Sequence, residues 1–288
     1  MSETAPNTAR LVVACEDRPG IVSAIAGFLA DRGVNILTSH QYSRGNGSGR
    51  FFLRMEFACP PGLEVATLEE RFEQDVAKPF EMDWQIWQTG RAKRVAVLVS
   101  KYDHCLQELL WRWRRAELGG AELALVASNH PDLKEPVEAF GLPYHYIPVE
   151  KGKKPEAEAA QLELLAGSCD LVVLARYMQI LSGEFLQGLG VPVINIHHSF
   201  LPAFAGAGPY ERAKERGVKL VGATAHYVTE ELDAGPIVEQ DVIRVDHADS
   251  ARELERLGAD IERAVLARAV QWHCEDRILL DGNTTVVF

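Results

Sequence analysis

Two polar side chains that can bind a carbonyl group lie at the end of an apolar run in the second half of the chain. The run Val191–Ile196 is apolar except at Pro192 and Asn195, and His197 follows it directly. Residues two apart on a strand point to the same face, so the Asn195 amide and the His197 imidazole would lie side by side. Both groups can donate hydrogen bonds to an oxygen that gains negative charge. On these residues alone, a polar strand end without catalytic function is the simpler interpretation.

A carboxylate that could act with this pair lies further along the chain. Asp233 is in the polar segment Tyr227–Pro236, which lies between two strand-like runs and ends in a Gly-Pro breaker. A carboxylate beside an imidazole raises the pKa of the imidazole and fixes its tautomer. Asp233 could equally be a turn former, and His226 could be either a partner of the site or a packed histidine. The residues themselves leave these alternatives open.

The sequence shows no metal-binding pattern. It has no HExxH segment, and its five cysteines are far apart, without the spacing of a zinc site. The number of cysteines is odd, and a chain of 288 residues does not need disulfides to fold. We therefore expect no metal, no other cofactor and reduced cysteines.

Charge and hydrophobicity exclude two classes of partner. The chain has 41 acidic and 30 basic residues, a net charge of -11, so binding to a nucleic-acid backbone is not expected. No apolar run approaches the roughly 20 residues that span a bilayer. The N-terminal Met1–Pro6 lacks a charged segment followed by an apolar one, so we expect no secretory signal and a cytoplasmic location.

The elements that must position the polar residues follow from the apolar pattern after Arg94. Runs that are apolar on both faces alternate with helical spacing, which predicts an α/β domain with a mostly parallel sheet covered on both sides. Ligands in such folds bind at the carboxyl ends of the strands. The predicted parallel strands are 95–100, 123–127, 144–147, 171–174 and 191–196, the antiparallel strands are 220–228 and 237–245, and the helices are 105–113, 156–166, 185–189 and 251–273.

The first part of the chain has a different pattern. Short β-branched or alternating runs and two amphipathic helices follow one another in the order βαββαβ, which predicts a ferredoxin-like domain. The turn-rich segment 45–49 predicts a hairpin between the two middle strands. The polar stretch 88–93 is a linker by composition. We therefore divide the chain into domains 1–89 and 90–288.

Several separated motifs in the second domain resemble the folate-dependent formyltransferase superfamily. They are Arg176–Leu181, Asn195-Ile-His197 with Ser199–Pro202, His226, and Leu232–Ile237. The resemblance covers essentially all of 94–288 and implies a Rossmann-like formyltransferase domain whose catalytic residues are Asn195, His197 and Asp233. It also implies a set of residues that bind the folate substrate: Arg176, Met178, Gln179, Ile180, Leu181, His226, Thr229, Glu230, Glu231 and Leu232.

The first domain resembles an ACT domain, with Asp17-Arg-Pro-Gly-Ile21 at its first strand–helix turn. An ACT domain before a formyltransferase domain resembles the formyltetrahydrofolate deformylase family, and the match continues to Asp281–Phe288. The resemblance implies a hydrolase that acts on a linear amide C–N bond. It would convert 10-formyltetrahydrofolate and water to tetrahydrofolate and formate, in support of one-carbon balance and purine biosynthesis. An ACT domain further implies a homo-oligomer, a dimer or tetramer joined partly through residues 10–88. The domain would either bind an amino-acid effector, such as glycine or methionine, or only join subunits.

Hydrolysis is favoured over transfer by the segment after the first strand of the second domain. Transformylases of the superfamily hold the phosphate of their acceptor with a Gly-rich loop there, whereas Val99–Cys105 contains no glycine. The pair His197-His198 also resembles the deformylase version. Ala205 and Gly208 depart from the family, which often has Lys there, with an unknown effect on substrate affinity. A formyltransferase with an unidentified acceptor is the alternative, and a non-catalytic folate or amino-acid sensor is a third.

The expected mechanism follows from the charge that develops. Water attacks the formyl carbon, and Asn195 and His197 donate hydrogen bonds to the carbonyl oxygen as it becomes negative. Asp233 binds the water and deprotonates it, directly or through His197. Which of the two is the general base stays open.

Overall fold

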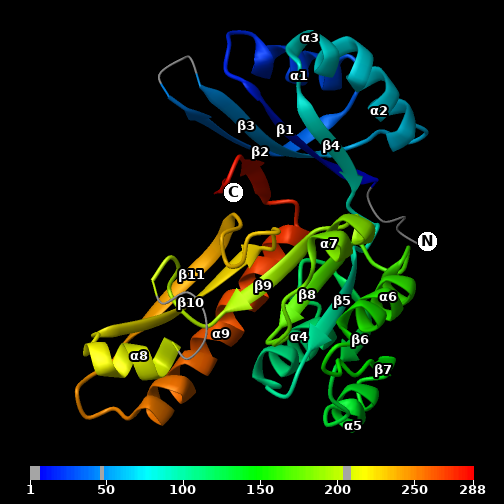
Figure 1. Ribbon diagram of the computed structural model, residues 1–288. Coiled ribbons are helices and arrows are strands. Elements are labelled where there is room, and N and C mark those ends of the chain that lie inside the picture. The colour runs from blue at the N-terminus through cyan, green and yellow to red at the C-terminus, as the bar shows by residue number, and fades with distance from the viewer. Residues whose placement is uncertain (1–6, 46–48, 204–208) are drawn as a thin grey trace. The chain divides into compact units, whose positions relative to one another are not determined.

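The computed structural model describes residues 7–45, 49–203 and 209–288, and they form two compact units (Figure 1). The first unit comprises the described part of Met1–Ala92 together with Asp276–Leu279 and Val286–Phe288. The second comprises Lys93–Glu275 and Leu280–Thr285. The division near residue 92 falls inside the predicted linker. The C-terminal end differs from the sequence interpretation, which assigned all of it to the second domain.

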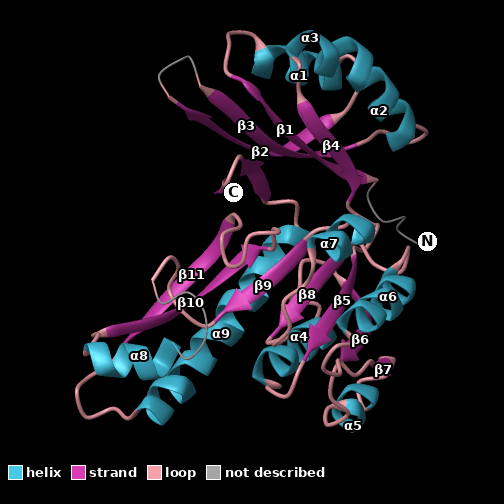
Figure 2. Ribbon diagram, viewed as in Figure 1, coloured by secondary structure: helices cyan, strands magenta, loops and turns pink. Residues whose placement is uncertain are grey.

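The first unit is a four-stranded antiparallel sheet with helices on one face (Figures 1 and 2). The strand order is β2-β3-β1-β4, so the order along the chain is the predicted βαββαβ. The second helix continues from α2 through a π-helical turn, η1, into α3. The elements are β1 Thr8–Glu16, α1 Ile21–Ala30, β2 Asn35–Arg44, β3 Arg50–Ala58, α2 Val65–Phe72, η1 Glu73–Ala77, α3 Lys78–Phe80 and β4 Asp83–Gln88.

The two faces of this sheet are covered by different partners. Alternate residues of β1, such as Leu11 and Val13, pack with the helices into one apolar core. On the other face, Ala14 and Phe52 pack with Leu279 of the C-terminal segment. Burial on both faces explains why β3 is apolar over most of its length.

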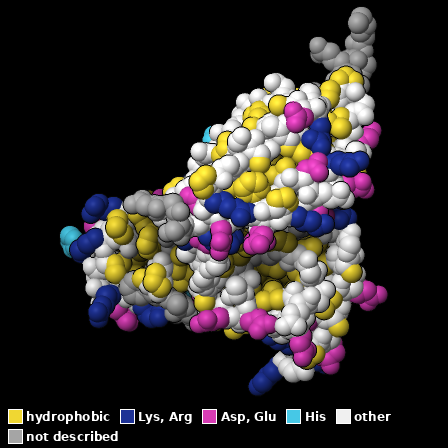
Figure 3. All heavy atoms as spheres, turned by 90° about the horizontal axis from the view of Figure 1, so that it is seen from above, with side chains coloured by type: hydrophobic (Ala, Val, Ile, Leu, Met, Phe, Trp, Pro, Cys, Tyr) yellow, Lys and Arg dark blue, Asp and Glu magenta, His cyan; other side chains and the backbone are white. Residues whose placement is uncertain are grey.

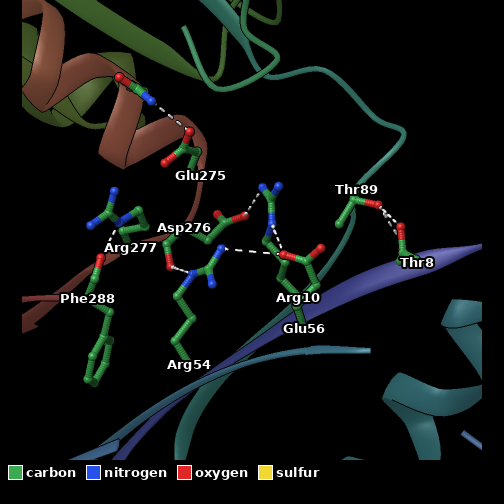
Figure 4. A network of polar contacts seen from close by, with 10 residues as sticks. Thr8, Arg10, Arg54, Glu56, Thr89, Glu275, Asp276, Arg277 and Phe288 are labelled. Atoms are coloured by element: carbon green, nitrogen blue, oxygen red, sulfur yellow. Dashed lines mark hydrogen bonds and ion pairs between the residues drawn. The ribbon is translucent and has the colours of Figure 1, made fainter. Parts of the chain in front are cut away.

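Buried charges on that second face are paired with the C-terminal segment (Figure 4). Arg54 Nε donates a hydrogen bond of 3.1 Å to the carbonyl oxygen of Asp276, and Arg10 Nη1 lies 3.5 Å from the Asp276 carboxylate. Glu56 accepts from Arg10 Nε at 3.4 Å. Burial lowers the pKa of Arg54, and the charge of Arg10 lowers it further, while the charges of Glu56 and Asp276 raise it.

The predicted hairpin pairs β2 with β3, and β2 is exposed to solvent. β2 and β3 pair up to Arg44 and Arg50, and the turn residues 46–48 lie outside the described part of the chain. Every residue of β2 is exposed in the isolated chain, including Leu37 and Tyr42. The reason is its position, because β2 is the edge strand of the sheet.

The second unit is built on a seven-stranded sheet in the order β11-β10-β9-β8-β5-β6-β7. The five strands from β5 to β9 are parallel to one another, whereas β10 runs antiparallel to both β9 and β11. This confirms the predicted mostly parallel α/β sheet. The elements are β5 Arg94–Val99, α4 His104–Arg114, β6 Glu122–Ser128, α5 Lys134–Glu138, β7 Tyr144–Tyr146, α6 Lys154–Leu165, β8 Leu171–Ala175, α7 Gly183–Leu189, β9 Val193–His197, α8 Pro209–Arg216, β10 Leu220–Tyr227, β11 Ile237–Arg244 and α9 Ala251–Cys274.

Local chemistry sets the limits of the elements that matter for function. β9 begins at Val193 because Pro192 has no N–H to donate; its carbonyl oxygen still accepts from the Val172 amide. α9 begins after Ser250, whose hydroxyl accepts a hydrogen bond from the Glu253 amide, a common N-cap. Three features were not predicted from the sequence: α5, α8 and the C-terminal hairpin of β12 (Ile278–Asp281) and β13 (Thr284–Val287).

The exposed surface carries charges of both signs. On the face shown in Figure 3, Lys and Arg side chains are interspersed with Asp and Glu, so neither sign dominates there. Among the described helices, none combines the length and the apolar character needed to cross a membrane.

Candidate active site

The end of β9 brings the predicted pair of polar side chains together with a histidine from the next strand. Asn195 and His197 lie on the same face of β9, and the antiparallel pairing with β10 sets His226 directly opposite Asn195. The Asn195 Nδ2 and His226 Nε2 atoms are 3.2 Å apart. His197 and His226 are both buried, so their ring nitrogens interact with protein groups or a ligand rather than with bulk water.

The tautomer of His226 follows from its hydrogen bonds. Its Nδ1 lies 3.0 Å from the carbonyl oxygen of Tyr227, which can only accept, so Nδ1 carries a proton. Burial lowers the pKa of His226 and keeps the ring neutral, so Nε2 accepts a hydrogen bond from the Asn195 amide. This contact orients Asn195 with its nitrogen toward His226 and leaves a second N–H for another acceptor. His226 is therefore a positioning residue.

Asp233 reaches the same place from the loop between β10 and β11. Its Oδ1 lies 3.3 Å from His197 Nδ1 and 3.9 Å from His226 Nε2, and its side chain is buried. Its backbone has a φ of 57°, a conformation that a non-glycine residue adopts at a cost. The arrangement directs the Nδ1 proton of His197 to a carboxylate, as in a catalytic His–Asp pair. His197 Nε2 is buried and has no hydrogen-bond partner among the described residues.

A pocket of about 270 Å³ opens beside these three residues. Every residue that the sequence analysis assigned to catalysis or substrate binding lines it. The catalytic assignments are Asn195, His197 and Asp233, and the binding assignments are Arg176, Met178, Gln179, Ile180, Leu181, His226, Thr229, Glu230, Glu231 and Leu232. Leu174, Tyr177, Ile196, His198 and Val228 also line the pocket without having been predicted.

The walls of this pocket combine exposed apolar side chains with a few polar ones. Met178, Ile180 and Leu232 line it and are more than half exposed, at 52%, 61% and 57%. Exposed apolar side chains that converge on one pocket are typical of a surface that a flat, partly apolar ligand covers. A hydrogen bond fixes the backbone of this wall, because Ser100 Oγ accepts from the Met178 amide.

Behind the pocket lies a buried polar cluster that the sequence analysis missed. Glu262 of α9 accepts hydrogen bonds from Tyr210 Oη at 2.7 Å and from His104 Nε2 at 2.8 Å, and Arg176 Nε lies 3.5 Å from it. Burial would raise the pKa of Glu262, but the His104 hydrogen bond and the Arg176 charge lower it to about 2. The spacing of residues in α9 could have indicated this burial. Glu262 is one turn from the buried Gly258 and Leu266, so it faces the interior.

His198 lies between Tyr210 of this cluster and His197. Its ring is 5.3 Å from that of His197 and 5.9 Å from that of Tyr210, measured between centroids. Burial and the charge of Arg176 lower the pKa of His198 to about 4, so it is neutral at pH 7. It therefore adds no positive charge beside His197.

One group of residues in the described part of the chain has metal-ligand geometry. Ligand atoms of His104, Cys105 and Glu262 lie within 4.8 Å of one another. His104 and Glu262 already hydrogen-bond to each other, and the guanidinium of Arg176 is next to them. Burial raises the pKa of Cys105 well above its usual value, which favours the neutral thiol over the thiolate that binds metals. These residues fit a hydrogen-bonded network better than a metal centre.

Two further observations from the sequence concern the segment after β5 and the positions Ala205 and Gly208. Ser100 and the five residues after it contain no glycine and continue into α4, so no Gly-rich anion loop follows β5. Ala205 and Gly208, where the family often has Lys, lie outside the described residues.

Comparison with known proteins identifies a family for each of the two domains. The Formyl transferase family matches residues 93–270, and the ACT domain family matches residues 9–69. A formyltetrahydrofolate deformylase of Mycobacterium tuberculosis is 54% identical over 281 residues, which are 97% of this chain and 90% of that protein. One from Bacillus subtilis is 52% identical over 280 residues, 97% of this chain and 93% of that protein.

Solved structures give the same result. The crystal structure of a formyltetrahydrofolate deformylase from Pseudomonas syringae pv. tomato superposes with a TM-score of 0.94 at 47% identity, covering 100% of this chain and 96% of that one. The resemblance seen in the sequence motifs is thereby confirmed for both domains. The chain belongs to the formyltetrahydrofolate deformylase family.

Proposed function

We propose that the chain hydrolyses 10-formyltetrahydrofolate to tetrahydrofolate and formate. The observation that carries the proposal is the set of Asn195, His197 and Asp233 in one pocket, with His197 Nε2 buried and unpartnered among the described residues. A buried ring nitrogen without a partner has a high cost unless a ligand atom meets it in the working complex. The formyl oxygen is such an atom.

Asn195 and His197 form the oxyanion site. The Asn195 N–H that does not bind His226 and the Nε2–H of a protonated His197 both donate to the formyl oxygen. Asp233 stabilises the protonated ring through Nδ1. Because the site is desolvated, each donor contributes on the order of 3–4 kcal/mol as the oxygen becomes negative.

Asp233 is the group that takes the proton of the attacking water, because the Nε2 proton of His197 is committed to the oxygen. Water adds to the formyl carbon and gives one proton to Asp233. The C–N10 bond then breaks, N10 receives that proton, and the product acid loses the remaining one as formate. One water is consumed for each formyl group, and no acceptor takes part.

The two segments that flank the catalytic residues bind the folate. Residues 176–181 follow β8 and residues 228–232 follow β10, and both segments line the pocket. Met178, Ile180 and Leu232 are exposed apolar residues that a pterin ring would cover. Loss of this water-exposed apolar surface favours binding.

The alternative, formyl transfer to an unidentified acceptor, makes a different prediction in one assay. The purified chain is incubated with 10-formyltetrahydrofolate, and formate is measured with and without amine acceptors, among them glycinamide ribonucleotide. Hydrolysis predicts formate at the same rate in every sample. If tetrahydrofolate appears only with an acceptor, together with the formylated acceptor and without formate, the transferase alternative is correct.

The first unit regulates or assembles the enzyme. Its edge strand β2 is exposed along its whole length, including the apolar side chains of Ile36, Leu37 and Tyr42, and such an edge is suited to pairing with a second copy. We expect a homo-oligomer, a dimer or tetramer, in the cytoplasm, with an amino acid such as glycine or methionine as effector. Sedimentation that shows a monomer at micromolar concentration would contradict the oligomer.

A further inference from the structure

Arg176 is a buried cation, and two of its three side-chain nitrogens make no hydrogen bond within the described part of the chain. It follows directly after β8 and is 5% exposed, with a backbone φ of 61°. Its Nε and Nη1 atoms are buried and make no hydrogen bond to any described residue. Buried guanidinium groups normally satisfy most of their five N–H donors. Two unsatisfied nitrogens in Arg176 therefore indicate a ligand that accepts hydrogen bonds.

The neighbours of Arg176 hold its charge without occupying its donors. The Glu262 carboxylate is 3.5 Å from Nε, but its two oxygens already accept hydrogen bonds from Tyr210 and His104. On another side the guanidinium carbon is 4.8 Å from the centroid of the Tyr102 ring. A carboxylate and an aromatic face stabilise the cation and fix its plane, while they leave the N–H groups able to bind an acceptor.

The place of Arg176 connects it with the product of the reaction. It lines the catalytic pocket together with Asn195, His197 and Asp233. Hydrolysis in this pocket converts a neutral amide into a formate anion beside the carboxylate of Asp233. The two negative charges repel each other. A planar guanidinium is the side chain whose geometry best matches a small carboxylate.

We propose that Arg176 is a formate-binding residue, which binds the product after it has formed beside Asp233. The inference rests on the proposed function, since it concerns the product of that reaction. Arg176 also lines a second hollow, whose other charged or titratable residues are Arg252, Arg256, His104, Glu255 and Glu262. The same guanidinium can therefore bind formate in the pocket and pass it toward this more cationic hollow.

The test measures formate binding to the purified full chain without any folate, by the broadening of the formate proton resonance at constant ionic strength. The wild-type chain binds formate saturably. Arg176→Lys keeps the charge but loses the paired donors, so its affinity falls about tenfold or more. Glu262→Gln removes a negative charge 3.5 Å from Arg176 Nε, so the electrostatic repulsion of formate decreases and the affinity rises several-fold. Arg115→Lys, an exposed pair partner of Glu117, is the matched control and binds as the wild type does.

Three results would overturn the proposal: no saturable binding to the wild type, equal affinity of the wild type and Arg176→Lys, or an equal loss in the Arg115→Lys control. If Glu262→Gln is too unstable for titration, its melting temperature is measured instead, and formate must raise it more than it raises that of the wild type. Turnover of 10-formyltetrahydrofolate is assayed on the same samples. Formate binding without turnover contradicts the proposed function, whereas turnover without Arg176-dependent binding contradicts only this inference.

Discussion

Replacing Asp233 with asparagine removes a charge from the site with almost no change in shape. Asp233 Oδ1 is 3.3 Å from His197 Nδ1, and both side chains are more than nine-tenths buried. With an effective dielectric constant of about 20, two opposite charges at this distance attract by about 5 kcal/mol. The protonated His197 that donates to the oxyanion loses that stabilisation in Asp233→Asn, which corresponds to a decrease of roughly 10³- to 10⁴-fold in kcat.

The assay follows formate release at saturating substrate, with the binding of tetrahydrofolate measured by fluorescence titration. Product binding is expected to change little, because the substitution leaves the proposed folate-binding segments 176–181 and 228–232 unaltered. Asp132→Asn, the same change at an exposed aspartate outside the pocket, retains full activity. A kcat within tenfold of the wild type for Asp233→Asn would refute the assignment of Asp233 as both the partner of His197 and the acceptor of the water proton.

The other predictions concern stability. Ala in a helix is usually more stable than Gly by up to about 1 kcal/mol, and Gly27→Ala in α1, where a Cβ has free space, should show that gain in urea unfolding. Gly258→Ala should instead destabilise the chain, because its Cβ would fall on the Tyr210 hydroxyl; a stabilised variant would be evidence against this packing. Burial and the charge of Lys93 lower the pKa of His273 to about 3, from 6.5, so the unfolded chain binds the extra proton below pH 6.5. The free energy of unfolding therefore falls as the pH decreases from 6.5, by about 1.4 kcal/mol per pH unit for this residue, and His273→Gln should remove that part of the slope; an unchanged slope would contradict it.

The sequence predicted the strands of the second unit well because their burial leaves a local signal. β5 and β8 are apolar on both faces, as buried parallel strands must be, and β9 ends in polar residues where the fold binds ligands. Asp233 is far from His197 along the chain, and its assignment depended on the family motif. The periodicity of the sequence alone could not show that the two side chains meet.

The contacts that were not predicted are those of buried polar residues. The sequence pattern shows that such a residue is buried, but it does not show which residue it contacts. Glu262 lies on the interior side of α9, yet nothing local indicates that it meets Arg176 and His104 from other elements. The C-terminal segment gave the same difficulty: Asp276 binds Arg54, 222 residues earlier, and this contact places part of the chain end in the first unit. Long-range pairs of this kind depend on the folded arrangement of elements, which short segments do not encode.

Hydrolysis in oxygen-18 water tests the central claim most directly. The chain is incubated with 10-formyltetrahydrofolate in labelled water with no acceptor present, and the formate is analysed by mass spectrometry at early times. Attack by water at the Asn195–His197–Asp233 site predicts that each formate molecule carries one labelled oxygen and that formate and tetrahydrofolate form in equal amounts. Formate without label, or no formate until an acceptor is added, would contradict the account.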